Sequence, residues 1–195
     1  MSKGWIGFGV LAVIAVGLVI SGVGTYNRLV ELDEGVDNAW SQVENVYQRR
    51  ADLIPNLVAT VKGAKDFEQE TLTQVVEARA KVGQVNFDEA PDAAQLREFE
   101  AAQSGLSSAL SRLLVVVERY PELKATEAFR DLQAQLEGTE NRITVERKRF
   151  NDATLEYNKT RRTFPTVLLA GILGFDDKPY FESTEGAEEP PKVEF

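Results

Sequence analysis

The stretch YNRLVELDEGVDNAWSQVENVYQRRADLIPNLVATVKG, residues 26–63, decides the fold class. Its apolar residues recur in alternating steps of three and four, which is the spacing of one face of an amphipathic helix and not of a strand. The resulting seam consists of Leu29, Leu32, Val36, Ala39, Val43, Val46, Arg50, Leu53 and Leu57. We expect this helix to run to about Lys62, with Gly63 as its C-terminal stop.

Three further helices are predicted downstream. The second occupies about 67–82, with Asp66 as its N-cap. The third begins at Asp92, where Gln95 can complete a capping box, and ends before Pro121.

The fourth helix starts between Glu122 and Thr126 and runs to about Arg161. Its largest apolar residues keep a strict spacing of seven: Phe129, Leu136, Ile143, Phe150 and Tyr157. Four amphipathic helices with short connections predict an all-α protein with a long antiparallel four-helix bundle over residues 26–162. A coiled-coil rod of several chains could use the same heptads.

An uncharged segment precedes the first amphipathic helix. Residues 5–24, WIGFGVLAVIAVGLVISGVG, would rise about 30 Å as a helix, which matches the hydrocarbon core of a bilayer. Trp5 and Tyr26 bracket the segment as interfacial aromatics. A cleaved signal peptide is the alternative, but its apolar region would be shorter. We therefore predict an N-terminal transmembrane helix within residues 1–25 and a single-pass protein of the cell (inner) membrane, with the lipid bilayer as its first partner.

The charges beside this segment bear on its orientation. Lys3 and the amino terminus are positive charges on the N-terminal side of the segment, whereas on its other side Arg28 stands among several acids. This distribution favours a bundle on the periplasmic or extracellular side. The basic end of the fourth helix favours the cytoplasmic side, so that orientation is not excluded.

Composition excludes several kinds of chemistry. The chain of 195 residues has no cysteine and no histidine, so disulfides, the usual zinc sites and nucleophile arrangements that need an imidazole base are excluded. Its net charge of −9 argues against nucleic acid as a partner. The usual di-iron site of helical bundles also needs histidine. We expect no cofactor, no metal and no enzymatic activity.

The sequence QRRADLIP places charged residues and a proline inside the first helix. Arg50 occupies a seam position, and antiparallel packing of the first and fourth helices would bring it opposite Glu137 and Glu140, with which it could form an ion pair. Pro55 has no backbone N–H and therefore leaves the carbonyl of Ala51 without its hydrogen bond within the helix. Polar neighbours such as Arg49, Asp52 and Asn56 could satisfy that carbonyl.

We predict that these residues form a structural brace, with a partner-binding or ligand-binding patch as the alternative. The candidate residues are Arg49, Arg50, Asp52, Pro55, Glu137, Glu140, Asn141, Arg142 and Trp40, the last as a core or groove-lining residue.

An apolar segment, residues 163–182, follows the fourth helix. Its stretch FPTVLLAGILGF is too short to span a bilayer. It could lie in the membrane interface with nearby arginines toward lipid phosphates, or fold over the open end of the bundle or onto a neighbouring subunit. The residues concerned are Arg161, Arg162, Phe164, Leu168, Leu169 and Phe175. The acidic tail, residues 183–195, is predicted to be mobile.

Several motifs carry a family resemblance. Residues 26–63, EARA at 77–80, YPELKATEAFRDLQAQLEGTENRI at 120–143 and RFNDATLEYN at 149–158 resemble the pattern of the LemA family of bacterial membrane proteins. The resemblance implies a membrane-anchored helical-bundle protein of the bacterial envelope, and the family defines no catalytic residues. Some members are linked to a membrane metalloprotease. Two hypotheses follow: a scaffold that forms homo-oligomers at the membrane, or an adaptor or regulator of a membrane protease.

Overall fold

The computed structural model of the chain describes residues 3–64, 67–85, 87 and 89–182. The helices are α1 (Lys3–Lys62), α2 (Gln69–Val82), α3 (Ala93–Val117), α4 (Pro121–Lys124), α5 (Glu127–Arg162) and α6 (Thr166–Leu173). No strand occurs within these described ranges, so the predicted all-α class is confirmed.

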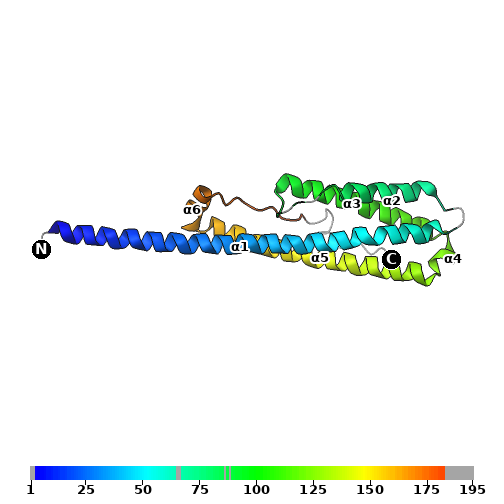
Figure 1. Ribbon diagram of the computed structural model, residues 1–195, viewed down its shortest axis with the longest axis horizontal. Helices are drawn as coiled ribbons and strands as arrows, with labels where there is room; N and C mark the ends of the chain where they lie inside the picture. The colour runs from blue at the N-terminus through cyan, green and yellow to red at the C-terminus, as the bar shows by residue number, and fades with distance from the viewer. Residues whose placement is uncertain (1–2, 65–66, 86, 88, 183–195) are drawn as a thin grey trace, which may run out of the picture.

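Helix α1 is the axis of the molecule. Its 60 residues correspond to about 90 Å, and its N-terminal part projects beyond every other helix (Figure 1). Large apolar side chains on this projecting part are exposed: Phe8, Leu11, Val13, Val16, Ile20 and Val23. At the other end the helix stops at Lys62, as the sequence predicts. The side chain of Trp5 lies outside the described residues.

In the part of the chain that the structure describes, no helix combines the length and the hydropathy needed to cross a membrane.

Helix α5 packs antiparallel along α1, whereas α2 and α3 form a hairpin beside the far half of this pair (Figure 1). Two ion pairs mark the register between the long helices. Arg28 lies 2.5 Å from Glu156 near one end, and Arg50 lies 2.7 Å from Glu140 further along. The packing of α1 on α5 follows from the heptad seams of both helices, which bury residues such as Val36 and Phe150.

The apolar core has two parts. At the far end, α1, α2, α3, α4 and α5 all contribute buried side chains, among them Leu57, Val75, Leu113, Leu123 and Phe129. Nearer the N-terminus, α2 is absent from the core. There the core is built from α1, α5, the start of α3 and the chain after α5, through residues such as Trp40, Phe99, Phe150, Phe175 and Phe181.

Local signals explain most helix ends. Asp92 accepts hydrogen bonds from the backbone N–H groups of Ala94 and Gln95, and the Gln95 side chain accepts from the Asp92 N–H, which is the predicted capping box. The hydroxyl of Thr126 accepts from the Phe129 N–H at the start of α5.

Two predicted helix ends are displaced. The second helix starts at Gln69 rather than at residue 67, with Glu68 as an N-cap that makes no side-chain cap bond; the predicted cap Asp66 lies outside the described residues. The third helix ends at Val117, three residues before Tyr120, because the chain turns there and Pro121 opens the short α4.

After α5 the chain reverses. Helix α6 ends at Leu173, and its C-cap Gly174 has a φ of +79°, the left-handed conformation that glycine adopts most easily. Residues 175–182, which we call the strap, carry no regular structure and run back along α5 (Figure 1). The tail predicted to be mobile, residues 183–195, lies outside the described residues.

Candidate functional site

The predicted brace centres on Arg50, which is 2% exposed. Its Nη1 donates to Oε1 of Glu140 at 2.7 Å and to Oγ of Ser107 at 3.0 Å. Its Nη2 donates to the side-chain oxygen of Gln103 and, at 3.4 Å, to the Gln103 carbonyl. The guanidinium also lies over the Tyr47 ring, 5.1 Å from its centroid. One arginine thus ties α1 to both α3 and α5.

Of the two predicted glutamates, only Glu140 contacts Arg50. Glu137 is exposed and accepts a hydrogen bond from Gln133 one turn away at 3.1 Å. Sequence reasoning missed Gln103 and Ser107. A signal for them was present in the sequence, because Gln103 is a polar residue inside the apolar seam of the third helix. Ser107 follows four residues later and therefore lies on the same face.

The carbonyl that the proline of α1 leaves without a helical donor is satisfied from a different helix. Pro55 cannot donate to the Ala51 carbonyl, and Nε of Arg79 in α2 donates to that oxygen instead, at 2.9 Å. The expectation that Arg49, Asp52 or Asn56 would do so is wrong, because the donor to this carbonyl comes from α2. Arg79 approaches it from outside.

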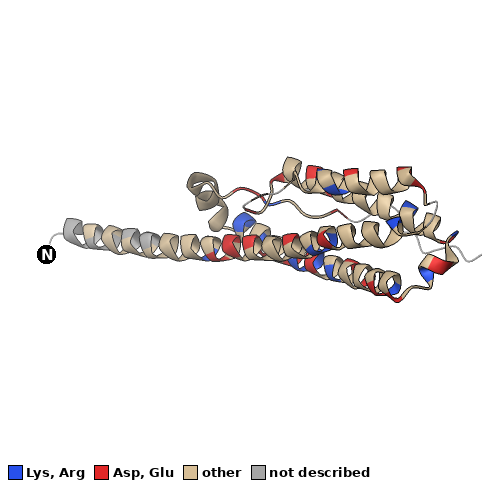
Figure 2. Cartoon of the chain, turned by 45° about the vertical axis from the view of Figure 1, so that its right-hand side comes forward, with Lys and Arg blue, Asp and Glu red and all other residues tan. Residues whose placement is uncertain are grey.

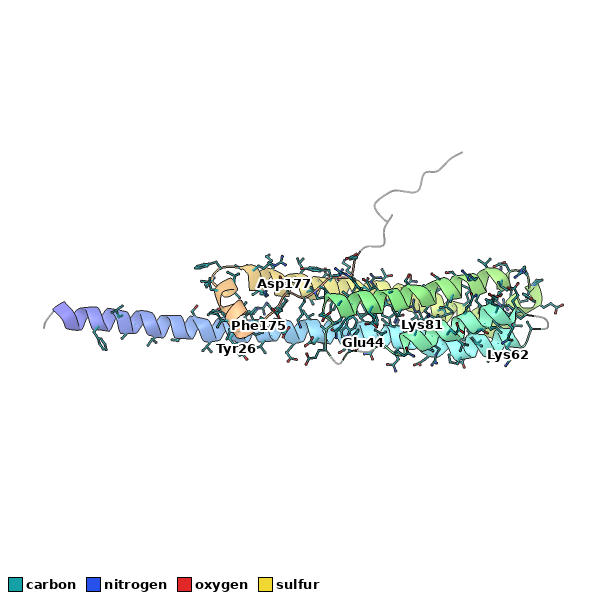
Figure 3. All side chains as sticks on the ribbon, turned by 90° about the horizontal axis from the view of Figure 1, so that it is seen from above. Tyr26, Glu44, Lys62, Lys81, Phe175 and Asp177 are labelled. Carbon is teal, nitrogen blue, oxygen red and sulfur yellow. The ribbon has the colours of Figure 1, made fainter. Side chains whose placement is uncertain are left out.

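An open cleft of about 830 Å³ adjoins the brace between α1, the end of α2 and α3. Its lining includes Tyr47, Asp52, Arg79 and Gln103, and also Glu44, which Figure 3 labels on α1. Burial raises the pKa of the Tyr47 phenol above its usual value. Polar groups that fix the helices therefore form part of the cleft wall.

The predicted patch does not form one surface. Arg49, Asn141 and Arg142 line a separate, open hollow of about 420 Å³ between α1 and α5, whereas Asp52 faces the larger cleft. Pro55 is exposed. These residues are thus divided between two faces of α1.

Trp40 is a core residue, 1% exposed. Its ring meets aromatic rings from four other parts of the chain, at centroid distances of 5.1 Å to Phe99, 5.7 Å to Phe150, 6.2 Å to Phe181 and 6.4 Å to Phe87. The indole therefore joins α1, α3, α5, the α2–α3 loop and the strap.

The arginines at the end of α5 contact the strap. Arg161 donates from Nε to the Phe175 carbonyl at 2.6 Å, and both Arg161 and Arg162 pair with Asp177, at 2.9 and 3.2 Å (Figure 3). The Phe175 ring packs edge-on against Tyr26 at 5.8 Å. In this conformation both arginines therefore bind Asp177 of the strap, whereas the first of the two alternatives had them point at lipid phosphates.

The apolar residues around α6 are divided. Phe175 and Ala170 are buried in the core, and Leu169 is half-buried. Phe164 and Leu168 are 76% and 61% exposed. The segment folds onto the end of α1 and α5, as one of the two alternatives held, and still presents an apolar outer face.

Tyr157 gives a test of the strap contact through pH. Its hydroxyl donates to the Asp176 carbonyl at 2.9 Å, and burial, helped by the charge of Asp33, raises its pKa to about 12. An unfolded chain would lose this proton near pH 10, so the contribution of Tyr157 to stability is present below pH 10 and is lost as the pH rises toward 12. We expect the stability advantage of the unaltered chain over Tyr157→Phe to shrink by about 1 kcal/mol from pH 9 to pH 11 in denaturant melts. An advantage that stays constant over this range would show that Tyr157 titrates normally.

Comparison with known proteins identifies the family of this chain. The LemA family profile matches residues 39–195. The magnetosome protein MamQ 2 of Paramagnetospirillum magneticum is 26% identical over 206 residues, covering 92% of this chain and 74% of that protein. Protein LemA of Metamycoplasma hominis is 23% identical over 163 residues, covering 84% of this chain and 71% of its own. The family match spans most of the chain, so this protein belongs to the LemA family.

Proposed function

We propose that this protein is a non-enzymatic, membrane-anchored scaffold of the bacterial envelope, built on a four-helix bundle that self-associates. The observation that carries the proposal is the continuity of α1. One uninterrupted helix runs through the uncharged segment 5–24 and on into the core of the folded unit. A rigid connection of this kind fixes the distance between a bilayer and the far end of the bundle.

The N-terminal part of α1 has the surface of an anchor. Its described large side chains are apolar and mostly exposed, from Phe8 at 74% to Val23 at 55%. Contiguous exposed apolar surface on this scale is covered by lipid or by another protein. A bilayer fits, because residues 5–24 carry no charge.

Helix α6 supports the same placement. It has no charged residue (Figure 2), and Ile172 on its outer face is 82% exposed. Phe175, two residues after α6, packs on Tyr26, where the uncharged part of α1 ends. Helix α6 therefore lies at the level where an anchor would leave the bilayer, and its apolar face would rest in the interface.

The brace supports a structural role for the folded unit. Arg50, Gln103, Ser107 and Glu140 hold one another through short hydrogen bonds. Such a network fixes helices relative to one another, and it leaves the guanidinium committed to internal partners.

The anchor is tested by extraction of native membranes at alkaline pH. We expect the full chain to stay in the membrane pellet and the double variant Val13→Lys with Val16→Lys to be released, because each lysine near the centre of a span costs about 2.5–3.5 kcal/mol. The matched control places the same two lysines on exposed valines of the folded unit, at Val115 and Val145. Equal release of both double variants would contradict the anchor.

A separate experiment determines on which side of the membrane the bundle lies. With the bundle outside, as we propose, protease added to intact spheroplasts cleaves it. A bundle that is cut only after lysis would reverse the orientation.

A further inference from the structure

The strap is held by its backbone. Five of its carbonyls each accept a hydrogen bond from a different side chain of α5: Phe175 from Arg161 at 2.6 Å, Asp176 from Tyr157 at 2.9 Å, Lys178 from Asn158 at 2.8 Å, Phe181 from Asn151 at 3.1 Å and Glu182 from Arg147 at 3.1 Å. The order along α5 is roughly the reverse of that along the strap, so the two segments run antiparallel. Contacts to backbone atoms do not depend on which side chains the bound segment carries.

Two asparagines form the centre of this site. The side-chain oxygen of Asn158 accepts from the Lys178 N–H at 3.0 Å, and that of Asn151 accepts from the Phe181 N–H at 2.9 Å. Each amide therefore pairs with both the N–H and the C=O of one strap residue, as a neighbouring strand would.

The spacing of the two asparagines matches an extended ligand. Seven residues of helix rise about 10.5 Å, and three residues of extended chain rise about 10 Å. Asn151 and Asn158 are thus set at the separation of every third residue of an extended peptide, here Phe181 and Lys178.

Side-chain contacts define which peptide fits. The Phe181 ring lies against Trp40 and Phe150, and the guanidinium of Arg147 lies 4.5 Å from its centroid. Between the two aromatic ends of the strap, the Lys178 amine lies 2.9 Å from a carboxylate oxygen of Asp33. The groove selects an aromatic residue at each end and a cation between them.

We infer that the groove between α1 and α5 is a binding site for an extended peptide of the strap's chemistry, and that its second occupant is the strap of another copy of this chain. Asn151, Asn158 and Arg147 recognise the backbone, while Trp40, Phe150 and Asp33 recognise the side chains.

The second occupant is inferred from the way the strap is connected to α5. The strap reaches the groove only through residues 163–165 and α6, whose outer face is exposed. The groove binds this chain's own strap, and the strap of a second copy has the same sequence and would offer the groove the same backbone and side-chain groups. The inference rests on the proposed function to the extent that self-association in one membrane brings neighbouring copies together.

The site is tested with the full chain in detergent and a labelled peptide of sequence GFDDKPYFE, residues 174–182. The receptor carries Phe181→Ala, which weakens its own strap. We expect saturable binding that falls at least tenfold when Asn151→Ala and Asn158→Ala are added, and at least tenfold when the peptide lacks the phenylalanine equivalent to Phe181. Asn141→Ala, an exposed asparagine on the same helix, should leave binding unchanged. Circular dichroism checks that each receptor is folded.

Exchange between copies is tested by cross-linking, since the chain has no cysteine of its own. Asp37 and Lys178 lie 3.9 Å apart at their charged atoms. Chains carrying Asp37→Cys and chains carrying Lys178→Cys are co-expressed with different tags and treated with a short bis-maleimide. We expect a linked pair of the two tags, absent when Val115→Cys replaces Asp37→Cys.

Two results would overturn the inference: no peptide binding to folded Phe181→Ala receptor, or oligomers that show no link between the two tags. A further outcome concerns a chain that carries both Asp37→Cys and Lys178→Cys. If the peptide binds, and this chain links its own two cysteines while it stays monomeric, the groove remains a peptide site. That result would remove both the second occupant and the proposed self-association.

Discussion

Replacing Trp40 by alanine is expected to lower the free energy of unfolding by about 3–5 kcal/mol, the largest effect of any single substitution proposed for this chain. The ring is 1% exposed and packs on aromatic rings of three other segments and the α2–α3 loop. Its loss leaves a cavity that rings from separate segments can fill only by moving together. Chemical denaturation of the full chain in detergent measures the change.

The matched control is Trp40→Phe. The indole N–H is buried and donates to no group in the described part of the chain, so phenylalanine loses no hydrogen bond. We expect it to retain well over half of the stability that alanine loses. Equal losses for the two variants would show that the aromatic cluster contributes little, and that the packing of α1 on α5 depends on the other seam residues.

Removal of Glu140 is expected to be the second large effect. Glu140→Ala leaves the guanidinium of Arg50 buried without its carboxylate, which should cost about 3 kcal/mol, at the lower end of the range for breaking a buried pair. The remaining partners, Gln103 and Ser107, are neutral. Glu140→Gln keeps an acceptor and should cost less.

The opposite substitution should be milder. Arg50→Met removes the buried charge itself, and Glu140, whose side chain is 50% exposed, can turn to water. The group left without a partner is Gln103, which is 5% exposed, so a loss of about 1–2 kcal/mol is expected and Gln103→Leu in the same chain should recover much of it. A larger loss for Arg50→Met than for Glu140→Ala would contradict this description of the brace.

Much of this architecture could be read from periodicity. The seven-residue spacing in the fourth helix and the seam of the first identify the faces that meet, and the similar lengths of the two amphipathic stretches set their register. That register predicts Arg50 opposite Glu137 and Glu140, and Glu140 is the one that pairs with it. Residues such as Asp92 and Thr126 mark helix starts because their side chains cap the backbone locally.

The strap could not be predicted in the same way. An extended segment has no period, and its hydrogen bonds to α5 join residues that are 14 to 35 positions apart in the chain. Asn151 and Asn158 look like ordinary polar residues on a solvated helix face, and only the presence of the strap gives them a role. Arg79 is a similar case, because its partner is a carbonyl freed by a proline in another helix.

The division of the core follows from helix lengths that the sequence did indicate. Helix α2 is 14 residues and α3 is 25, so the α2–α3 hairpin covers only part of the 36-residue α5. The uncovered part of the α1–α5 groove would expose an apolar seam. The strap and α6 bury that seam, and this arrangement explains why Phe175 and Phe181 belong to the core rather than to a tail.

Self-association of the full chain is the measurement that tests the proposed scaffold most directly. Two copies with different affinity tags are co-expressed, extracted in mild detergent and recovered through one tag, and the mass of the complex is measured by light scattering. We predict that both tags are recovered together in a single discrete oligomer. Recovery of one tag alone, at the mass of a monomer in each mild detergent tried, would contradict the scaffold; a monomer that co-purifies with a membrane protease would instead point to an adaptor.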